Sequence, residues 1–229
     1  MDGKDLLVNE NKNTGIINYN AINYSIIEFI PSFTQEILDI GCGTGDLAKH
    51  LNNRYNFDGI TYSIEEAKIA KNSLRNIWTL DLNNFQHEKI GSHTYDCIVA
   101  SHILEHIYEP WKLVGELQKA LKPKGIIIIA VPNVLFYKQR LVFLKGKFKY
   151  SLNGGIMDIT HYRFFDWNNA DILLNNCKLT LKKKTGTGIF PLGKLRKLNL
   201  SFINKFENFI IRKFPNLFNY QTIIILEKN

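Results

Sequence analysis

The sequence predicts an α/β fold: a doubly wound, mostly parallel seven-stranded sheet with an antiparallel last strand and helical lid insertions. Three observations predict this fold. Short apolar runs alternate with amphipathic stretches from residue 20 to about 132, and a glycine-rich turn follows the first of these runs. Two more strand-like segments, separated by a basic stretch, follow later in the chain. Apolar runs joined by helices favour parallel strands linked by right-handed crossovers.

Seven apolar segments are the predicted strands, and helical patterns lie between them. Strands are expected at 36–40, 57–62, 77–80, 95–100, 126–131, 179–184 and 221–227. Helices are expected at 20–30, 46–54, 64–75, 110–121, 134–150, 167–176 and about 193–213. Pro110 at a helix start and Pro123 after a helix end support these boundaries, because proline is favoured at the first helical position and cannot continue a helix.

Composition favours a globular protein of the reducing cytosol. The 229 residues fit one domain of ordinary size, and the apolar fraction of 45% is sufficient for a core. The three cysteines, Cys42, Cys97 and Cys177, follow no disulfide or metal spacing. The N-terminal segment does not resemble a signal peptide, and the longest apolar run, 126–131, is far shorter than the roughly 18 residues of a membrane span. We therefore expect a cytoplasmic protein.

Charge is distributed unevenly along the chain. Residues 1–132 contain 12 basic and 16 acidic side chains, whereas residues 133–229 contain 17 basic and 5 acidic ones. Such asymmetry indicates that the second part faces an anionic partner, such as a phosphate, a nucleic acid or a membrane surface. A solvated basic face without a partner would give the same count.

The glycine-rich turn at residues 41–45 is the most informative motif. Gly41, Gly43 and Gly45 follow a buried strand and precede an amphipathic segment, so a nucleotide-like ligand can approach bare main chain there. A dinucleotide fingerprint would need a further glycine at position 46, which is Asp46. That carboxylate would repel a pyrophosphate but would tolerate a sulfonium cation with an amino-acid tail.

Several blocks of the chain, in order and at suitable spacing, match one family. They are ILDIGCGTG (37–45), GITYS (59–63), LDL (80–82), YDCIVASHILEH (95–106), LKPKG (121–125), VPN (131–133) and DITHYRFF (158–165). With these blocks the chain resembles a class I S-adenosylmethionine-dependent methyltransferase. It is most similar to the small-molecule and sugar-modifying branch whose members end with a His-x-Arg-Phe-Phe block.

The resemblance implies a Rossmann-like fold, with S-adenosylmethionine as the cofactor and no metal ion. It also implies a single methyltransferase domain over residues 1–229. Within this domain, 20–132 would form the cofactor-binding core, and 133–220 would contain the acceptor-side insertions and late strands. The implied cofactor-binding residues are Asp39, Gly41, Cys42, Gly43, Gly45, Thr61, Tyr62, Glu66, Asp81, Leu82 and Ser101.

Three of these positions have specific roles, each with an alternative. Asp39 would bind the cofactor's ammonium group through water, or would only hold the glycine loop together. Thr61 replaces the acid that usually binds the ribose hydroxyls, so we expect Thr61 to share that task with Glu66, as in a subset that includes cyclopropane fatty acid synthases. Asp81 would accept a hydrogen bond from the adenine amino group, or would only cap its loop.

The catalytic candidates are His106 and His161. Methyl transfer by in-line displacement needs alignment of donor and acceptor and, for an oxygen acceptor, a group that removes a proton. His106 follows the fourth strand, and His161 begins the late aromatic block. A structural histidine at either position is the alternative. Arg163 could pair with an anionic substrate or form a structural salt bridge.

The basic and aromatic insertion at 136–150 resembles the lid that shapes the acceptor pocket in this family. Its charge predicts a small-molecule, sugar or glycan acceptor that is anionic. The basic stretch 194–213 is amphipathic, so peripheral contact with an anionic membrane is a further expectation. An RNA methyltransferase and a nonenzymatic binding module with the same fold are the alternative functions.

Overall fold

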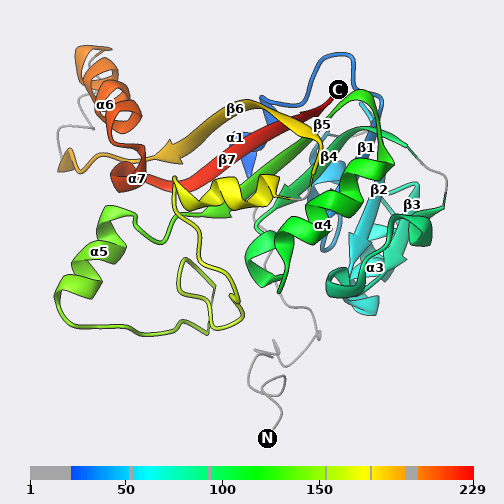
Figure 1. The fold of residues 1–229 in the computed structure, drawn as a ribbon, viewed down its shortest axis with the longest axis horizontal. Helices are drawn as coiled ribbons and strands as arrows, with labels where there is room; N and C mark the ends of the chain where they lie inside the picture. The colour runs from blue at the N-terminus through cyan, green and yellow to red at the C-terminus, as the bar shows by residue number, and fades with distance from the viewer. Residues whose placement is uncertain (1–21, 52–53, 92–93, 153, 176, 194–200) are drawn as a thin grey trace, which may run out of the picture.

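The computed structural model describes residues 22–51, 54–91, 94–152, 154–175, 177–193 and 201–229. Its centre is a seven-stranded sheet in the order β3-β2-β1-β4-β5-β7-β6 (Figure 1). The strands are β1 (Glu36–Ile40), β2 (Asn56–Thr61), β3 (Asn76–Thr79), β4 (Tyr95–Ser101), β5 (Leu121–Pro132), β6 (Leu179–Gly188) and β7 (Asn219–Lys228). Only β7 runs antiparallel to its neighbours, β5 and β6, as the sequence predicted.

Helices cover the sheet and extend beyond one of its ends. The α-helices are α1 (Tyr24–Ile27), α2 (Asp46–Leu51), α3 (Ile64–Ala70), α4 (Pro110–Leu117), α5 (Tyr137–Leu144), α6 (Ser201–Lys213) and α7 (Pro215–Phe218). The 3-10 helices are η2 (Leu82–Asn84), η3 (His87–Ile90), η4 (Leu104–His106), η5 (Gln118–Ala120) and η6 (Asn169–Leu174). Figure 1 shows α5 and α6 at the end of the molecule opposite β3. None of the described helices combines the length and apolar character that a bilayer-spanning segment needs.

The core consists of two apolar layers, one on each face of the sheet. Successive side chains of a strand point to opposite faces, so Ile127 and Ile129 join one layer while Ile126 and Ile128 join the other. Helix α4 contributes Leu113 to the first of these layers. Both faces are thus covered, which explains why the inner strands are continuous apolar runs.

Several predicted boundaries were wrong for local reasons. The insertion at 134–150 is helical only over Tyr137–Leu144, because Gly146 has φ +67° and ends the helix. Strand β5 begins at Leu121 rather than 126. The Pro123–Gly125 segment lies within the strand, where the pairing with β4 is irregular. The predicted helix at 20–30 is a single turn, α1, and the segment at 167–176 is 3-10. Residues 194–200 of the basic stretch lie outside the described residues.

Candidate active site

The predicted site residues gather where β1 and β4 end side by side. The sheet order reverses there, because the chain continues from β1 to β2 on one side and from β4 to β5 on the other. Open parallel sheets bind ligands in the crevice beyond the carboxyl ends of strands at this kind of switch point. Residues 41–45 and 101–106 occupy these two strand ends.

The glycine turn after β1 requires glycine for two reasons. Gly41, Gly43 and Gly45 have φ values of +73°, +52° and +80°, which are strained for other residues. A Cβ atom on Gly45 would also lie 3.3 Å from the Cα of Ala70 in α3. The turn is therefore packed closely on α3, and its conformation depends on the absence of side chains.

Cys42 contributes main chain rather than a thiol to this turn. Its side chain is buried, and a Cβ on Gly59 would lie 2.7 Å from its Sγ. Burial strongly raises the pKa of the Cys42 thiol, so the sulfur is a neutral core group.

Asp39 is a buried acid directly before the last residue of β1. It is 7% exposed, and burial raises the pKa of its carboxyl group to about 7. A nearby cation would lower this pKa, since it stabilises the ionised carboxylate. A ligand with an ammonium group fits this position.

Thr61 and Glu66, which were expected to share the ribose hydroxyls, lie side by side at the end of β2. The Thr61 hydroxyl donates to Glu66 Oε2 at 2.6 Å, and Ser63 Oγ caps α3 by accepting from the Glu66 amide at 3.2 Å. The Ser63-x-x-Glu66 spacing is that of a capping box, which starts the helix and brings Glu66 back toward the strand. Tyr62 is exposed beside this pair.

Asp81 caps its own loop. Its carboxylate accepts from the main-chain amide of Asn83 at 2.9 Å and from Asn84 Nδ2 at 3.0 Å, which starts the 3-10 turn η2 at Leu82. The loop-capping alternative is therefore realised. The carboxylate remains exposed to solvent. A further hydrogen bond to it from the adenine amino group stays a prediction.

A polar network that the sequence did not reveal joins three distant elements at the end of β4. Ser101 Oγ accepts from Asn23 Nδ2 at 3.0 Å, and Gln221 Oε1 accepts from the same amide at 2.9 Å. His102 Nε2 lies 2.8 Å from Gln221 Oε1, which makes it the donor. Asn23 precedes α1 and Gln221 belongs to β7, so no local sequence signal connects them to Ser101.

Glu105 lies at the centre of a histidine cluster. Its side chain is 1% exposed, and its Oε1 lies 3.4 Å from His102 Nδ1 and 4.0 Å from His161 Nε2. Its Oε2 has no hydrogen-bond partner among the described residues. The only sequence signal for Glu105 was an acid between the apolar residues Leu104 and Ile107.

Electrostatics favour opposite charges on Glu105 and His102. Burial alone would raise the pKa of Glu105, but the hydrogen bond and the charge of His102 outweigh it and lower that pKa. Burial likewise opposes protonation of His102, but the hydrogen bond to Glu105 and its charge raise the pKa of the imidazole. The carboxylate is therefore ionised at neutral pH.

The two predicted catalytic histidines are neighbours. The rings of His106 and His161 meet edge to face, with centroids 4.7 Å apart. The Thr160 hydroxyl donates to Asp158 Oδ1 at 2.6 Å, so it accepts from His106 Nδ1–H at 2.9 Å. Nδ1 is thus engaged by Thr160, and no hydrogen bond engages His106 Nε2 among the described residues.

His161 is held more tightly than His106. Its side chain is 5% exposed, and its Nδ1 lies 3.2 Å from the carbonyl oxygen of Ile156, to which it donates. Burial lowers the pKa of His161, so the imidazole is neutral at neutral pH. The main-chain oxygen of Glu105 accepts from the amides of Tyr162 and Arg163, which fixes the His161 loop against η4.

Arg163 pairs with no carboxylate in the part of the chain that the structure describes. Its guanidinium donates to the Tyr108 carbonyl and lies over the Trp111 ring, with Cζ 5.4 Å from the centroid. Phe165 is buried and pairs with Asn133 at the end of β5. The His-x-Arg-Phe-Phe block thus fastens the segment with His161 over the strand ends.

Three residues of the cluster could also hold a metal ion. Glu105, His106 and His161 offer ligand atoms within 4.8 Å of one another. No such set was expected from the residue spacing, because His161 comes from a distant loop. Among the described residues, His87, Glu88 and Glu116 form a second, more exposed group.

Comparisons with known proteins agree with this geometry. Residues 10–169 match a family model described as a methyltransferase domain. The chain is 26% identical over 198 residues to the ubiquinone biosynthesis O-methyltransferase of Hydrogenovibrio crunogenus, which covers 78% of each chain. It is 28% identical over 190 residues to an uncharacterised protein of Methanocaldococcus jannaschii, covering 76% of this chain and 73% of that one.

Solved structures share the fold. A SAM-dependent methyltransferase from Archaeoglobus fulgidus superposes with a TM-score of 0.61 at 19% identity, covering 89% of this chain and 91% of its own. The plantazolicin methyltransferase BpumL in complex with SAH gives a TM-score of 0.55 at 20% identity, covering 86% and 77%. Since the family model spans most of the chain, the protein belongs to the methyltransferase domain family and is a class I S-adenosylmethionine-dependent methyltransferase.

Proposed function

We propose that this enzyme methylates an oxygen atom of a small-molecule or glycan-type anionic acceptor. The observation that carries the proposal is the Glu105 cluster: two imidazoles beside a buried carboxylate, at the strand ends where the cofactor-binding residues gather. An oxygen nucleophile must lose a proton as it attacks, and a neutral histidine near an ionised acid accepts one at neutral pH. The relatives support the choice of oxygen, since the Hydrogenovibrio protein and a malonyl-[acyl-carrier protein] relative are named O-methyltransferases.

The chain's donor set fits S-adenosylmethionine. The cofactor supplies a methyl group on a positively charged sulfur, which is a good leaving group in an in-line displacement. The side-chain-free turn at Gly43 allows its tail to approach the main chain, and Asp39 provides the buried acid that favours a neighbouring ammonium group. The paired Thr61 and Glu66 offer oxygen acceptors for the ribose hydroxyls.

We assign the proton acceptor to His106 and a positioning role to His161. His106 has a free Nε2, and its other nitrogen is fixed by Thr160 and, through Thr160, by the buried Asp158. A base oriented by a third group in this way is typical of enzymes that activate a hydroxyl. His161 is nearly inaccessible to solvent. It packs against the His106 ring and keeps the Glu105 carboxylate close to the positive charge that forms on His106 when this residue accepts the proton.

An anionic acceptor is supported by the charge of the lid. The segment 136–152 contains five basic and no acidic side chains, and it leads directly into the loop with His161. The His-x-Arg-Phe-Phe block, which resembles that of sugar-modifying methyltransferases, supports a glycan-type acceptor. Arg163 contributes an exposed guanidinium without a carboxylate partner to the same side.

The experiment is methyl transfer from isotope-labelled cofactor into a cell extract, followed by mass spectrometry. We expect label in nuclease-resistant small molecules or glycans that bind an anion-exchange resin. Label in a nuclease-sensitive fraction would instead support the RNA methyltransferase alternative. With the acceptor found, His106→Gln should lower kcat by about 100-fold or more, while cofactor affinity stays unchanged. A larger loss in His161→Gln than in His106→Gln would reverse the two assigned roles.

A further inference from the structure

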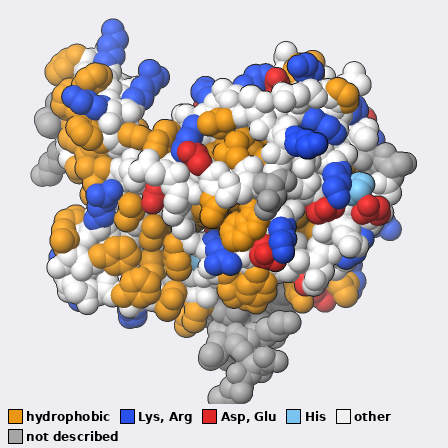
Figure 2. Space-filling model, in the orientation of Figure 1, with side chains coloured by type: hydrophobic (Ala, Val, Ile, Leu, Met, Phe, Trp, Pro, Cys, Tyr) orange, Lys and Arg blue, Asp and Glu red, His pale blue; other side chains and the backbone are white. Residues whose placement is uncertain are grey.

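Ten of the 21 exposed large hydrophobic side chains among the described residues lie in two short segments. The first segment is 136–152, which contains α5, and the second is 201–214, which contains α6. We call their joint outer face the distal surface. Its exposed hydrophobic residues are Leu141, Val142, Leu144, Phe148, Tyr150, Leu152, Phe202, Phe206, Phe209 and Phe214. Figure 2 shows orange and blue side chains together over the end of the molecule with α5 and α6.

Helix α6 turns its aromatic face away from the protein. Phe202, Phe206 and Phe209 follow the spacing of one helix face and are 68%, 50% and 59% exposed. The opposite face is attached to the protein: Ile203 is buried, and the Glu207 carboxylate accepts from the Phe190 amide at 3.1 Å. Among the described residues, no segment covers this apolar face of α6.

The charges of the distal surface are almost all positive. The first segment has five basic and no acidic residues, and the second has Lys205, Arg212 and Lys213 against Glu207. Lys213 Nζ lies 5.8 Å from the ring centroid of Phe209 and 5.7 Å from that of Phe214. Aromatic rings with lysines beside them match the interface of an anionic bilayer, where rings enter the headgroup region and amines meet lipid phosphates.

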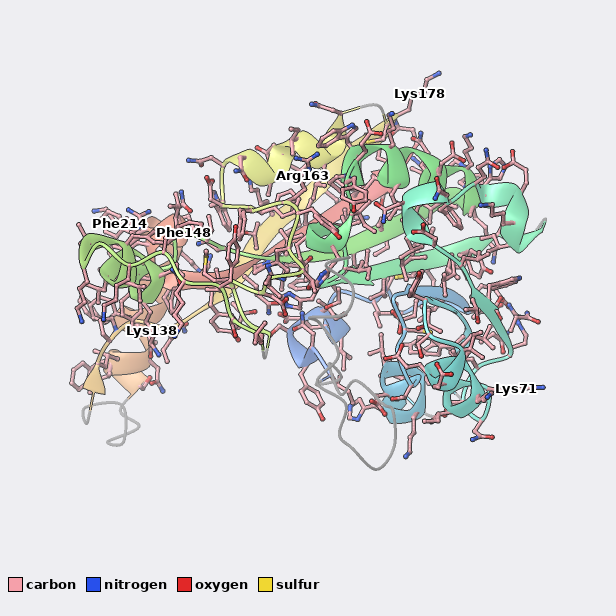
Figure 3. All side chains as sticks on the ribbon, turned by 90° about the horizontal axis from the view of Figure 1, so that it is seen from below. Lys71, Lys138, Phe148, Arg163, Lys178 and Phe214 are labelled. Carbon is pink, nitrogen blue, oxygen red and sulfur yellow. The ribbon has the colours of Figure 1, made fainter. Side chains whose placement is uncertain are left out.

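We propose that the distal surface docks the enzyme on an anionic lipid bilayer. In bulk solvent these side chains stay exposed, whereas insertion of α6 by its aromatic face would bury Phe202, Phe206 and Phe209 and bring the basic residues of the distal surface to the anionic headgroups. Figure 3 places Lys138, Phe148 and Phe214 together at this end of the molecule, while Lys71 and Lys178 lie far from them. The attraction is therefore directional and orients the molecule on the bilayer.

The docked segment is physically connected to the histidine cluster. Ser151, within the first segment, forms an isolated β-bridge with Asp158. The Ile159 amide donates to the carbonyl oxygen of Ser151. Asp158 in turn accepts from Thr160, which holds His106. Docking therefore places the lid and the candidate base near the lipid surface. This step rests on the proposed function, and it indicates an acceptor carried on a lipid.

Sedimentation with vesicles tests the docking without any acceptor. We expect the wild-type protein to bind vesicles of phosphatidylcholine with 30% phosphatidylglycerol, and to remain in solution with phosphatidylcholine alone. Replacing Lys147→Glu together with Lys205→Glu should weaken this binding at least ~10-fold. The control, Lys71→Glu together with Lys178→Glu, changes the net charge equally and should bind like the wild type. The double variant Phe202→Ser and Phe209→Ser should also lose binding, because it removes two of the rings that would enter the bilayer. Both side chains are exposed, so the variant should still fold.

Four outcomes would overturn the proposal. They are no vesicle binding, equal binding to neutral and anionic vesicles, equal losses in the two charge variants, and wild-type binding by the Phe202 and Phe209 variant. Salt-sensitive retention of RNA without vesicle binding would assign the distal surface to RNA. Dimers that light scattering detects in the wild type but not in the phenylalanine variant would assign it to a second copy. Cofactor binding, measured in parallel, separates a failure of docking from a failure of the proposed function.

Discussion

Asp39 shows how one buried side chain can couple cofactor binding to pH. Its carboxyl group is hidden from water, and burial raises its pKa to about 7. In the unfolded chain the same group ionises near pH 4. Between these values the folded state binds more protons, so Asp39 makes stability fall as the pH rises from about 4 to about 7.

Cofactor binding should show the opposite trend. Only the ionised carboxylate attracts an ammonium group, and its population rises about tenfold between pH 6 and pH 8 for a pKa near 7. We expect calorimetric affinity for S-adenosylhomocysteine to rise by up to about tenfold over this range. Asp39→Asn should remove that part of the pH dependence. The cofactor's own amino group titrates equally in both experiments, so identical slopes in the two proteins would place Asp39 outside the binding interaction.

At the scale of elements, the other buried acid of the parallel strands, Asp58, has a structural role. Asp58 in β2 is fully buried and accepts from Arg75 Nε at 3.0 Å, from the Asn76 amide at 3.1 Å and from the Tyr95 hydroxyl at 3.0 Å. These donors come from β3, β4 and the turn before β3. The carboxylate therefore connects β2 to β3 and, across β1, to β4, away from the strand ends where the predicted cofactor-binding residues lie.

Replacing this acid should affect stability and leave binding unchanged. Asp58→Asn removes the charge that pairs with Arg75 and puts an amide where donors converge, so we expect a loss of about 3 kcal/mol in the free energy of unfolding. Urea denaturation measures this loss. The matched control is Glu36→Gln, which removes the more exposed partner of Arg75 and should cost under about 1 kcal/mol. A folded Asp58→Asn protein with weakened cofactor binding would contradict the structural role.

The same elements show what the sequence could and could not predict. The mostly parallel sheet and the antiparallel β7 followed from apolar runs separated by helices. The shared role expected of Thr61 and Glu66 came from the family resemblance, and the two side chains are hydrogen-bonded to each other. The network of Asn23 with Gln221 could not be predicted, because its members meet only through sheet assembly. The helix expected over 134–150 was too long, because Gly146 takes a positive φ and ends it after Leu144.

At the scale of the whole molecule, cofactor binding and global unfolding are linked. A ligand that binds only the folded state at about 100 times its Kd adds about 2.7 kcal/mol of stability. For a chain of this size that corresponds to a rise in Tm of roughly 5–11 °C. The glycine turn joins β1, the central strand of the cofactor-binding half, to α2, so it can transmit this stabilisation to the sheet.

Gly43→Val tests whether the glycine turn is the origin of that link. The branched side chain is strained at φ +52° and would occupy the space of the cofactor's tail, so the variant should fold with a lower Tm and show no shift with S-adenosylhomocysteine. Gly146→Val is the matched control, since Gly146 also has positive φ, at +67°, but lies in the lid with open space around it. Gly146→Val should be strained in the same way, yet it should keep the full Tm shift with S-adenosylhomocysteine. The loss of this shift depends on where the side chain is added, not on backbone strain. A full shift in folded Gly43→Val protein would mean that the cofactor binds away from the end of β1.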